Sequence, residues 1–406
     1  MSREVDVAVI GAGQAGLSAA HFLRKAGYRA DESFVVFDHA PAPGGAWQFR
    51  WPTLTFRTVH GIYHLPGMDL PERRDPAPVA PAVSEYFRAY EERFDLRVRR
   101  PVDVRGVDNA ADGRLRIDTS DGEWIARGLI NATGTWDKPF LPYYPGRQTF
   151  AGRQLHTVDY RGPGEFAGRR VVVVGGGASG IQLLLEIAEV AADTTWVTRR
   201  PPVFTDRPFD ARWGREVEAR VAERVRRGLV PESVVAATGY RITPEVAAGM
   251  ASGVLDRLPM FDRVTASGVE WNDGRRVVAD VILWATGFRA SLDHLAPLRL
   301  RGPRGGIAMD DTQVAADPRV HLVGYGPSAS TLGANRAGRR AVRRLRRYLG
   351  GDQTLSLSGR SNVSATISSA ASTGLIVLSV LDGALSMAGV STNFATVLSP
   401  RSTYTA

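Results

Sequence analysis

Two apolar strands of this chain each lead directly into a glycine loop of the same spacing. Residues 7–10 (VAVI) precede residues 11–16 (GAGQAG), and residues 171–174 (VVVV) precede residues 175–180 (GGGASG). In the GxGxxG pattern the first glycine permits a tight turn, the second lets a pyrophosphate approach the backbone, and the third lets the following helix pack on the strand. One such motif is weak evidence, but two in a strand-loop-helix context predict two dinucleotide sites. The residues expected to bind phosphate are Gly11, Gly13, Gln14, Ala15 and Gly16 in the first loop and Gly175, Gly177, Ala178, Ser179 and Gly180 in the second.

The residue that follows the second strand of each copy distinguishes the two ligands. In the first copy, residues 34–37 (FVVF) end at Asp38, where an acid can accept hydrogen bonds from ribose hydroxyls. In the second copy, residues 195–198 lead to Arg199 and Arg200. Guanidinium groups bind phosphate in a bidentate manner, so these arginines fit the 2′-phosphate of NADPH. We therefore predict FAD at the first loop and NADPH at the second. The alternative for the two arginines is a solvated strand end in an arginine-rich chain.

Composition limits the class of protein. The chain has 406 residues, room for two or three domains, and no cysteine. The missing thiols exclude structural disulfides, a CxxC redox pair and a thiolate metal site, and so argue against a disulfide reductase. No apolar run is long enough to span a bilayer, and the first strand follows the N-terminus too closely for a signal peptide. We expect a cytoplasmic protein without an integral membrane segment.

The chain is basic, with a formal net charge of +9. Such a charge usually indicates nucleic-acid binding. The densest basic run, residues 339–349, however, keeps its apolar residues on one face at helical spacing. It therefore predicts an amphipathic helix with a solvated basic face, and we expect no nucleic-acid partner.

Two other constellations do not fit a catalytic site. His60 and His64 are four residues apart, but Gly61 and Pro66 argue against a helix that would present both, and no third ligand is near in sequence. We therefore expect no metal site. Ser179 lacks the second glycine of a GxSxG nucleophile elbow, so it is expected to belong to a phosphate loop and not to a hydrolase.

Residues 150–160 fit the pattern FxGxxxHxxxY, with His156 and Tyr160 as its last two fixed positions. This resembles the identifying motif of the flavin-containing monooxygenases and the related N-hydroxylating and plant auxin-forming enzymes, in which it also precedes the second glycine loop. Residues 131–134 (NATG) and 284–287 (WATG) resemble the two ATG segments of that superfamily, and residues 44–47 (GGAW) resemble its GGxW stretch beside the flavin. The resemblance covers about residues 5–350. It implies FAD, NADPH, dioxygen and a small-molecule substrate, with Gly45, Trp47, Thr133, Gly134, Thr286 and Gly287 near the cofactors.

The resemblance also gives roles to His156 and Tyr160, which are our candidate catalytic residues. It implies that His156 lies at a hinge between domains and helps to hold NADP against the flavin; the alternative is a hydrogen-bonded linker histidine. Tyr160 stands where Baeyer-Villiger monooxygenases carry Trp, and it is either functional or a packing residue. Tyr325 replaces the Asp that disulfide-reductase flavoproteins place near the ribityl chain.

The segment after the second ATG predicts a strand at residues 320–323, a turn, and a helix that runs to Leu349 with N-cap hydroxyls at residues 328–331. In this fold the start of that helix would face the flavin, with Gly333, Ala334 and Asn335 near the ring. Gly324, in the turn, is also expected to bind the cofactor. Earlier in the chain, the prolines between residues 66 and 81 predict a stiff loop before a helix at residues 86–94.

The expected fold class is α/β, with two Rossmann-like dinucleotide-binding domains and the NADPH domain inserted into the FAD domain. Residues 1–150 and 288–350 would form the FAD domain, and residues 151–287 the NADPH domain; residues 351–406 form a tail rich in Ser, Thr and Ala, of unknown role. The expected activity is NADPH-dependent transfer of one oxygen atom to nitrogen or sulfur. The alternatives are Baeyer-Villiger or decarboxylative oxygenation of carbon and, outside the enzymes, a regulatory flavoprotein that senses nucleotides.

Overall fold

The computed structural model describes residues 2–59, 61–71, 76–207, 211–232 and 238–350. The tail expected at residues 351–406 and His60 therefore lie outside the described residues. No helix of the described ranges is long and apolar enough to cross a membrane.

The first sheet contains the first glycine loop at the end of a buried central strand. Its strands, in the order in which they pair, are β16 (Met309–Asp310), β17 (Gln313–Val314), β18 (Asp317–Leu322), β5 (Gly122–Asn131), β1 (Arg3–Ile10) and β2 (Phe34–Phe37), with β4 (Leu115–Thr119) and β3 (Val104–Asn109) extending from β5. The pairs among β18, β5, β1 and β2 are parallel. The last four residues of β1 are buried, as expected of a parallel strand covered on both faces.

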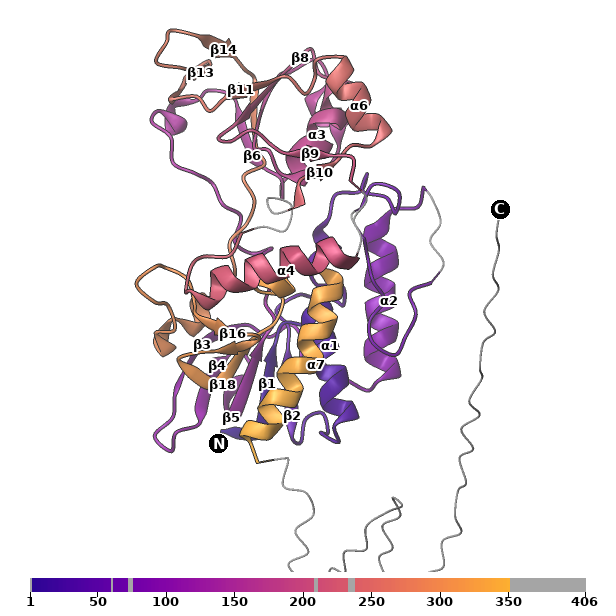
Figure 1. Ribbon diagram of the computed structural model, residues 1–406, viewed down its shortest axis with the longest axis vertical. Coiled ribbons are helices and arrows are strands. Elements are labelled where there is room, and N and C mark those ends of the chain that lie inside the picture. The colour runs from indigo at the N-terminus through magenta and orange to yellow at the C-terminus, as the bar shows by residue number, and fades with distance from the viewer. Residues whose placement is uncertain (1, 60, 72–75, 208–210, 233–237, 351–406) are drawn as a thin grey trace, which may run out of the picture. The chain divides into compact units, whose positions relative to one another are not determined.

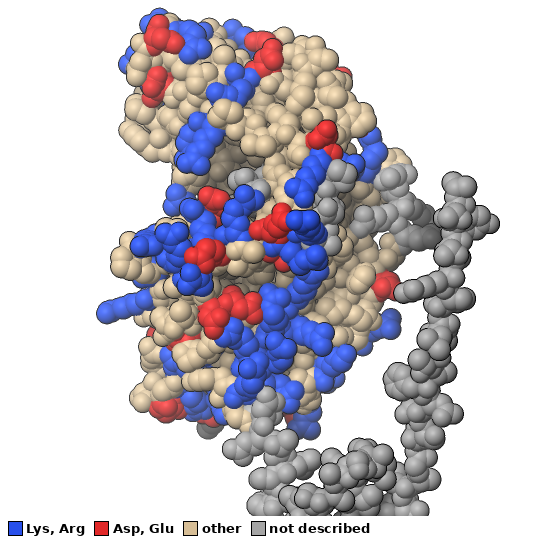
Figure 2. Space-filling model, in the orientation of Figure 1, with Lys and Arg blue, Asp and Glu red and all other residues tan. Residues whose placement is uncertain are grey.

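Two long helices pack against each other on this sheet, α1 (Gln14–Lys25) and α7 (Thr331–Tyr348) (Figure 1). Gly338 lets them approach closely, because a Cβ there would lie 2.8 Å from Ser18 Oγ. The other face of α7 carries arginines, and Figure 2 shows basic side chains gathered over this helix. Arg340 pairs with Asp311 at 2.9 Å, and Arg344 pairs with Asp310. The predicted amphipathic helix is confirmed.

Leu345 is the residue of α7 that fits most tightly onto the sheet. It is buried, and its Cδ1 lies 2.6 Å from the position that a Cβ at Gly128 of β5 would take. We expect Leu345→Ala to lower the free energy of unfolding by about 2–5 kcal/mol, because it leaves a cavity between helix and sheet. Urea unfolding followed by circular dichroism would measure this. The exposed neighbour Arg343 is the control, and equal loss in Arg343→Ala would contradict the packing argument.

The second sheet is parallel throughout, and its strands all come from the part of the chain between β5 and β18. In pairing order they are β11 (Arg257–Pro259), β8 (Asp193–Thr198), β7 (Arg170–Val174), β15 (Val281–Trp284) and β6 (Arg153–His156). The second glycine loop joins β7 to α3 (Ala178–Ala188). With both strand-loop-helix units in place, the expected α/β class is confirmed.

The remaining elements are smaller. They are α2 (Val79–Arg93), α4 (Ala211–Arg226), α6 (Pro244–Ala251), β9 (Phe204–Thr205), β10 (Tyr240–Arg241), β12 (Arg263–Thr265), β13 (Gly268–Glu270), β14 (Arg276–Val278), and the 3-10 turns η1 (Gly45–Phe49), η2 (Arg147–Thr149), η3 (Pro163–Phe166), η4 (Asp293–Leu298) and η5 (Gly326–Ser328).

The start of α2 corrects the sequence prediction. The helix begins at Val79 and not at residue 86, so Pro81 lies inside its first turn and not in a loop. Proline is tolerated there because the first N–H groups of a helix have no partner within the helix.

Further along the chain, α4 falls inside the expected NADPH domain, yet its Val225 packs in the same core cluster as strands of the first sheet. The domain bounds stay a prediction.

Candidate cofactor sites

The first glycine loop has the three properties expected of a pyrophosphate loop. Gly11 has φ +94°, and a Cβ there would lie 2.6 Å from the carbonyl oxygen of Ala132. Gly16 lies against Gly11, whose carbonyl oxygen would be 1.8 Å from a Gly16 Cβ. Gly13 is the N-cap of α1, and a Cβ there would meet no described atom within 4 Å. The loop is thus tightly packed at its two ends and accessible in the middle, at a helix N-terminus, which fits a phosphate group.

The second loop repeats this geometry. Gly175 has φ +131°, and its Cβ would lie 2.2 Å from the carbonyl oxygen of Ala285, while that of Gly180 would lie 2.6 Å from Gly175 O. Gly177 is the N-cap of α3, with no described atom within 4 Å of a Cβ. Ala132 and Ala285 are the alanines of the two ATG segments. Each ATG segment therefore supports the first glycine of one loop, a contact between residues more than a hundred positions apart.

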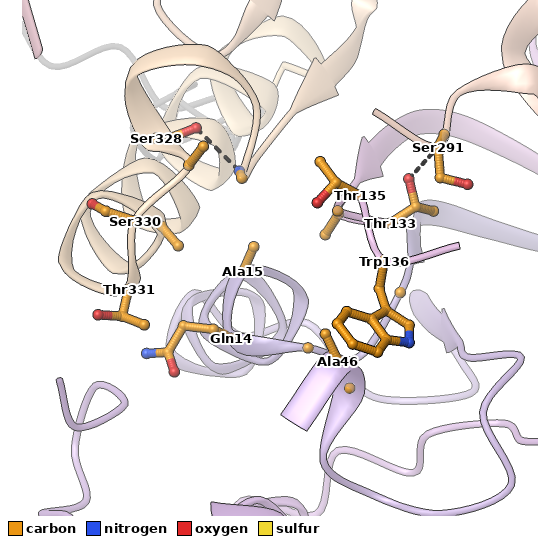
Figure 3. A pocket seen from close by; sticks show the side chains of 18 of the residues that line it. Gln14, Ala15, Ala46, Thr133, Thr135, Trp136, Ser291, Ser328, Ser330 and Thr331 are labelled. Atoms are coloured by element: carbon orange, nitrogen blue, oxygen red, sulfur yellow. Dashed lines mark hydrogen bonds between the residues drawn. The ribbon is translucent and has the colours of Figure 1, made fainter. Parts of the chain in front are cut away.

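A cavity of about 860 Å³ lies at the first loop (Figure 3). Figure 3 shows Ser328, Ser330 and Thr331 on one side and Thr133 and Trp136 on the other, with Gln14 and Ala15 between them. The predicted cofactor residues that line it are Gly11, Gly13, Gln14, Ala15, Asp38, Gly45, Trp47, Thr133, Gly134, Gly324 and Ala334. Gly16 and Gly333 do not line it. Gly16 packs on Gly11, and the Gly333 N–H donates to Ser330 Oγ at 3.0 Å, which caps α7.

Asp38 lies where the sequence places it but already has protein partners. Its carboxylate accepts hydrogen bonds from the backbone N–H groups of Ala12 at 3.1 Å and Ala40 at 2.9 Å, and Arg100 Nη2 is 3.4 Å away. A carboxylate offers about four acceptor positions, so these bonds leave room for a ribose hydroxyl. The side chain thus fixes the first loop to the end of β2 as well as facing the cavity.

The segment before α7 gives the cavity its hydroxyl-rich side. The Gly324 N–H donates to Ser328 Oγ at 3.0 Å, and Gly324 has φ +77°. The predicted N-cap is confirmed as Ser330. The positive end of the α7 dipole therefore faces a cavity in which negative charge would be stabilised. Tyr325, by contrast, is buried in the core cluster of the first sheet and does not line the cavity.

Several cavity residues were not found from the sequence. Trp136 stacks with Phe49, at 6.3 Å between ring centroids, and with Phe288, at 5.3 Å. His294 Nε2 donates to Asn131 Oδ1 at 2.7 Å, and burial lowers the pKa of His294 to about 4, so the ring is neutral at pH 7. One sequence pattern could have indicated the aromatic residues: each ATG segment is followed within two residues by an aromatic side chain, Trp136 or Phe288.

At the second loop, Arg199 and Arg200 are exposed at the end of β8. Arg257 also reaches the end of β8, because β11 pairs with β8 and Arg257 Nη1 donates to Thr198 Oγ1 at 3.4 Å. Sequence reasoning missed Arg257, which lies far along the chain. Thr286 Oγ1 donates to the carbonyl oxygen of Phe140. Neither the first cavity nor the second one described below is lined by Arg199, Arg200, Arg257 or Thr286.

His156 and Tyr160 are both buried and line neither cavity. His156 Nε2 donates to Gly287 O at 3.1 Å, and burial lowers the pKa of the ring, so it is neutral at pH 7. The Tyr160 hydroxyl donates to Glu186 Oε2 at 2.9 Å, an atom that also accepts from Thr53 Oγ1 at 2.7 Å. Both side chains therefore connect distant segments. Their catalytic roles stay predictions.

A second cavity of about 1490 Å³ adjoins the first, since Gly61 and Tyr63 line both. It is lined by residues of α3, α6 and β10 and by residues of the segments 53–59 and 61–63. Apolar side chains such as Leu185, Trp213 and Val246 share its wall with charged ones, namely Arg57, Glu186, Glu189, Arg207, Arg241 and Glu245.

Comparison with known proteins identifies the family. Residues 8–324 match the model of the pyridine nucleotide-disulphide oxidoreductase family. A flavin-containing monooxygenase from Stenotrophomonas maltophilia has a solved structure that superimposes with a TM-score of 0.73 at 38% identity, over 86% of this chain and 100% of that one. A CzcO-like uncharacterized oxidoreductase of Geobacillus kaustophilus is 29% identical over 74% of this chain and 88% of its own length. The indole-3-pyruvate monooxygenase YUCCA1 of Oryza sativa subsp. japonica is 27% identical over 70% of this chain and 77% of its own.

The family name refers to disulfide chemistry, for which this chain has no thiol. The structural match at 38% identity over the whole length of a monooxygenase agrees with the resemblance carried by FxGxxxHxxxY. The chain belongs to the pyridine nucleotide-disulphide oxidoreductase family and, within it, to the flavin monooxygenases, which use FAD and NADPH.

Proposed function

We propose that this protein uses NADPH and dioxygen to transfer one oxygen atom to a nitrogen or sulfur nucleophile of a small molecule. The observation that carries the proposal is the pair of glycine loops, each accessible at its middle glycine and each at a helix N-terminus. FAD, when bound, supplies the chemistry of hydride acceptance and oxygen activation. The protein's part is to bind the two dinucleotides, orient them and exclude water.

Different residues of the first cavity would bind different parts of the cofactor. Gly13 would admit the pyrophosphate, Asp38 would hold the ribose, and the N-terminus of α7 would face the end of the cofactor that gains negative charge. Gly45 is fixed beside this loop, because its Cβ would lie 2.8 Å from Gly13 Cα. Trp47 and Trp136 provide apolar walls, which limit the access of water.

The second loop would bind NADPH, with Arg199 and Arg200 at the 2′-phosphate. Ala178 and Ser179 begin α3, so their N–H groups are free to bind phosphate oxygens. His156 fixes the Gly287 carbonyl, and thereby the second ATG segment on which Gly175 rests. We assign His156 as a positioning residue.

The second cavity would admit the substrate. It adjoins the first cavity at Gly61 and Tyr63, so a molecule held there can reach the flavin side. Its mixed wall of apolar and charged side chains fits a small molecule with an apolar body and a polar group. The preference for nitrogen or sulfur over carbon rests on Tyr160, which stands where Baeyer-Villiger enzymes carry Trp.

The proposal is tested with FAD-loaded protein, NADPH and a panel of amines, thioethers and ketones under ¹⁸O₂. We expect NADPH consumption to rise with an amine or a thioether and the product to carry one ¹⁸O atom. Lactones or esters from the ketones would replace this proposal with Baeyer-Villiger oxygenation. NADPH consumption that no substrate stimulates, with both nucleotides bound, would favour a regulatory flavoprotein.

His156→Ala tests the positioning role. The variant should still accept hydride from NADPH at an unchanged rate but release roughly fivefold more hydrogen peroxide per NADPH, because the lost hydrogen bond is worth about 1 kcal/mol. Peroxide yield and stopped-flow flavin reduction measure the two quantities. His156→Gln is the matched control, since its amide can still donate to Gly287 O. Unchanged coupling in both variants would leave His156 as a linker residue only.

A further inference from the structure

Arg50 is a half-buried cation in the wall of the first cavity, directly after η1. Its guanidinium carbon lies 4.7 Å from the ring centroid of Trp136, 5.8 Å from that of Trp47 and 6.0 Å from that of Trp51. No described acid pairs with it, and burial lowers the pKa of Arg50 to about 10. The side chain is therefore a positive charge held among aromatic rings.

Two other arginines of this region, Arg100 and Arg336, have acidic partners. Arg100, behind Asp38, forms two hydrogen bonds to Glu91, at 2.6 and 2.9 Å. Arg336, which also lines the cavity, lies 3.7 Å from Glu218. Arg50 thus differs from both in what surrounds it, although it lies in the same part of the molecule.

A guanidinium without an acidic partner is costly to withdraw from water, even in part. Cation–π contacts offset only some of that cost. Aromatic faces also leave the five N–H donors of the guanidinium without acceptors. A phosphate or carboxylate accepts two of these hydrogen bonds in parallel, and in a site from which aromatic rings exclude water such a pair is strong.

The position of Arg50 relates it to both glycine loops. The first residue of η1, Gly45, lies against Gly13 of the first loop. Trp136, over which Arg50 lies, follows the first ATG segment and stacks on Phe288, which follows the second. Phe288 in turn contacts the ring of His156 at 5.1 Å between centroids. Arg50 therefore contacts a group of packed aromatic rings that links the first ATG segment, which packs on the first nucleotide loop, with the second ATG segment, which packs on the second loop.

We propose that Arg50 binds an oxyanion of a molecule held in the first cavity, either a phosphate of a dinucleotide or a carboxylate of the substrate. The shared chemistry is bidentate recognition of oxygen by a guanidinium whose other faces are covered by tryptophan. The inference rests on the proposed function in one respect, that the first cavity takes the flavin.

The test measures binding, not turnover, in wild type, Arg50→Gln, Arg50→Lys and the control Arg336→Gln. FAD is titrated into apoprotein by flavin fluorescence, and NADP⁺ and phenylacetate are titrated into FAD-loaded protein by calorimetry, with neutral phenylacetamide as reference. A charged hydrogen bond is worth about 1.5–3 kcal/mol, so Arg50→Gln should weaken one of the three anions by roughly ten- to a hundredfold. The affinity of Arg50→Lys for that anion should lie between those of Arg50→Gln and wild type. The affinity for phenylacetamide should be the same in all variants.

The weakened anion identifies the source: FAD or NADP⁺ for a cofactor phosphate, phenylacetate for a substrate carboxylate. The inference is overturned if Arg50→Gln leaves all three affinities unchanged, in particular if only the melting temperature falls, because Arg50 would then be a packing residue. It is also overturned if Arg336→Gln weakens the same anion equally. Failure of wild-type apoprotein to bind FAD would overturn the proposed function and this inference together, a result distinct from the others.

Discussion

Gly13→Val is expected to abolish FAD binding while the protein stays folded. The structure separates the two effects because a Cβ at Gly13 meets no described atom within 4 Å and the backbone there has φ −81°, which any residue adopts. The valine side chain would instead occupy the space through which the pyrophosphate approaches the N-terminus of α1. We expect the affinity for FAD to fall by more than about a hundredfold, that is by about 3 kcal/mol or more.

The measurement is fluorescence titration of apoprotein with FAD, together with circular dichroism and thermal unfolding of the same samples. Gly16→Val is the matched control. Its Cβ would lie 1.8 Å from the Gly11 carbonyl oxygen, so this variant should lose stability as well as cofactor. A Gly13→Val protein that binds FAD with wild-type affinity would show that the first loop does not hold the pyrophosphate.

This contrast also shows why the geometry of the first loop could be predicted from sequence. The close approach at Gly16 is local, because Gly16 meets Gly11 of the same six-residue loop, and the turn at Gly11 follows from its own φ of +94°, whereas the contact of Gly11 with Ala132 joins distant parts of the chain. Asp38 follows a four-residue strand that pairs with β1, so its place beside the loop follows from the order of strands. What was predicted well therefore depends on short-range backbone constraints.

The residues that escaped prediction depend on contacts between distant segments. Arg257 reaches Thr198 only because β11 adds to β8 in parallel. In α4, the buried residues Val217, Val221 and Val225 have the spacing of an apolar helix face, but the spacing does not say which core that face covers. Arg50 is one of many arginines in the sequence, and only the three tryptophans around it set it apart.

The α2 boundary was missed for a different reason. Pro78 and Pro81 were interpreted as loop residues, but Pro78 is the N-cap of α2 and Pro81 lies in its first turn. Both positions suit proline, since neither needs a backbone N–H to bond within the helix. A proline cluster before an apolar helical pattern is thus compatible with a helix start as well as with a stiff loop.

Replacing Arg199 and Arg200 is expected to change which nicotinamide nucleotide the protein prefers. Both side chains are exposed at the end of β8, beyond the loop where Gly177 would admit the pyrophosphate. NADPH differs from NADH only in its 2′-phosphate, so an arginine that binds this group contributes to one affinity and not to the other. A charge-assisted hydrogen bond is worth about 1.5–3 kcal/mol, which predicts a loss of roughly ten- to a hundredfold for NADPH in Arg199→Ala or Arg200→Ala.

The experiment titrates FAD-loaded wild type, the two single variants and the double variant with NADP⁺ and with NAD⁺. NAD⁺ binding by the same variants is the internal control, because a variant that perturbs the fold would weaken both nucleotides. Arg257→Ala extends the series: its guanidinium donates to Thr198 Oγ1 and not to a described acid, so it should cost less than either of the others if it only supports the strand end. Equal losses for NADP⁺ and NAD⁺ would mean that these arginines do not recognise the 2′-phosphate. If the double variant binds NADP⁺ as tightly as the weaker of the two single variants, only one of the two guanidinium groups contacts the phosphate, since the free energies of independent contacts add.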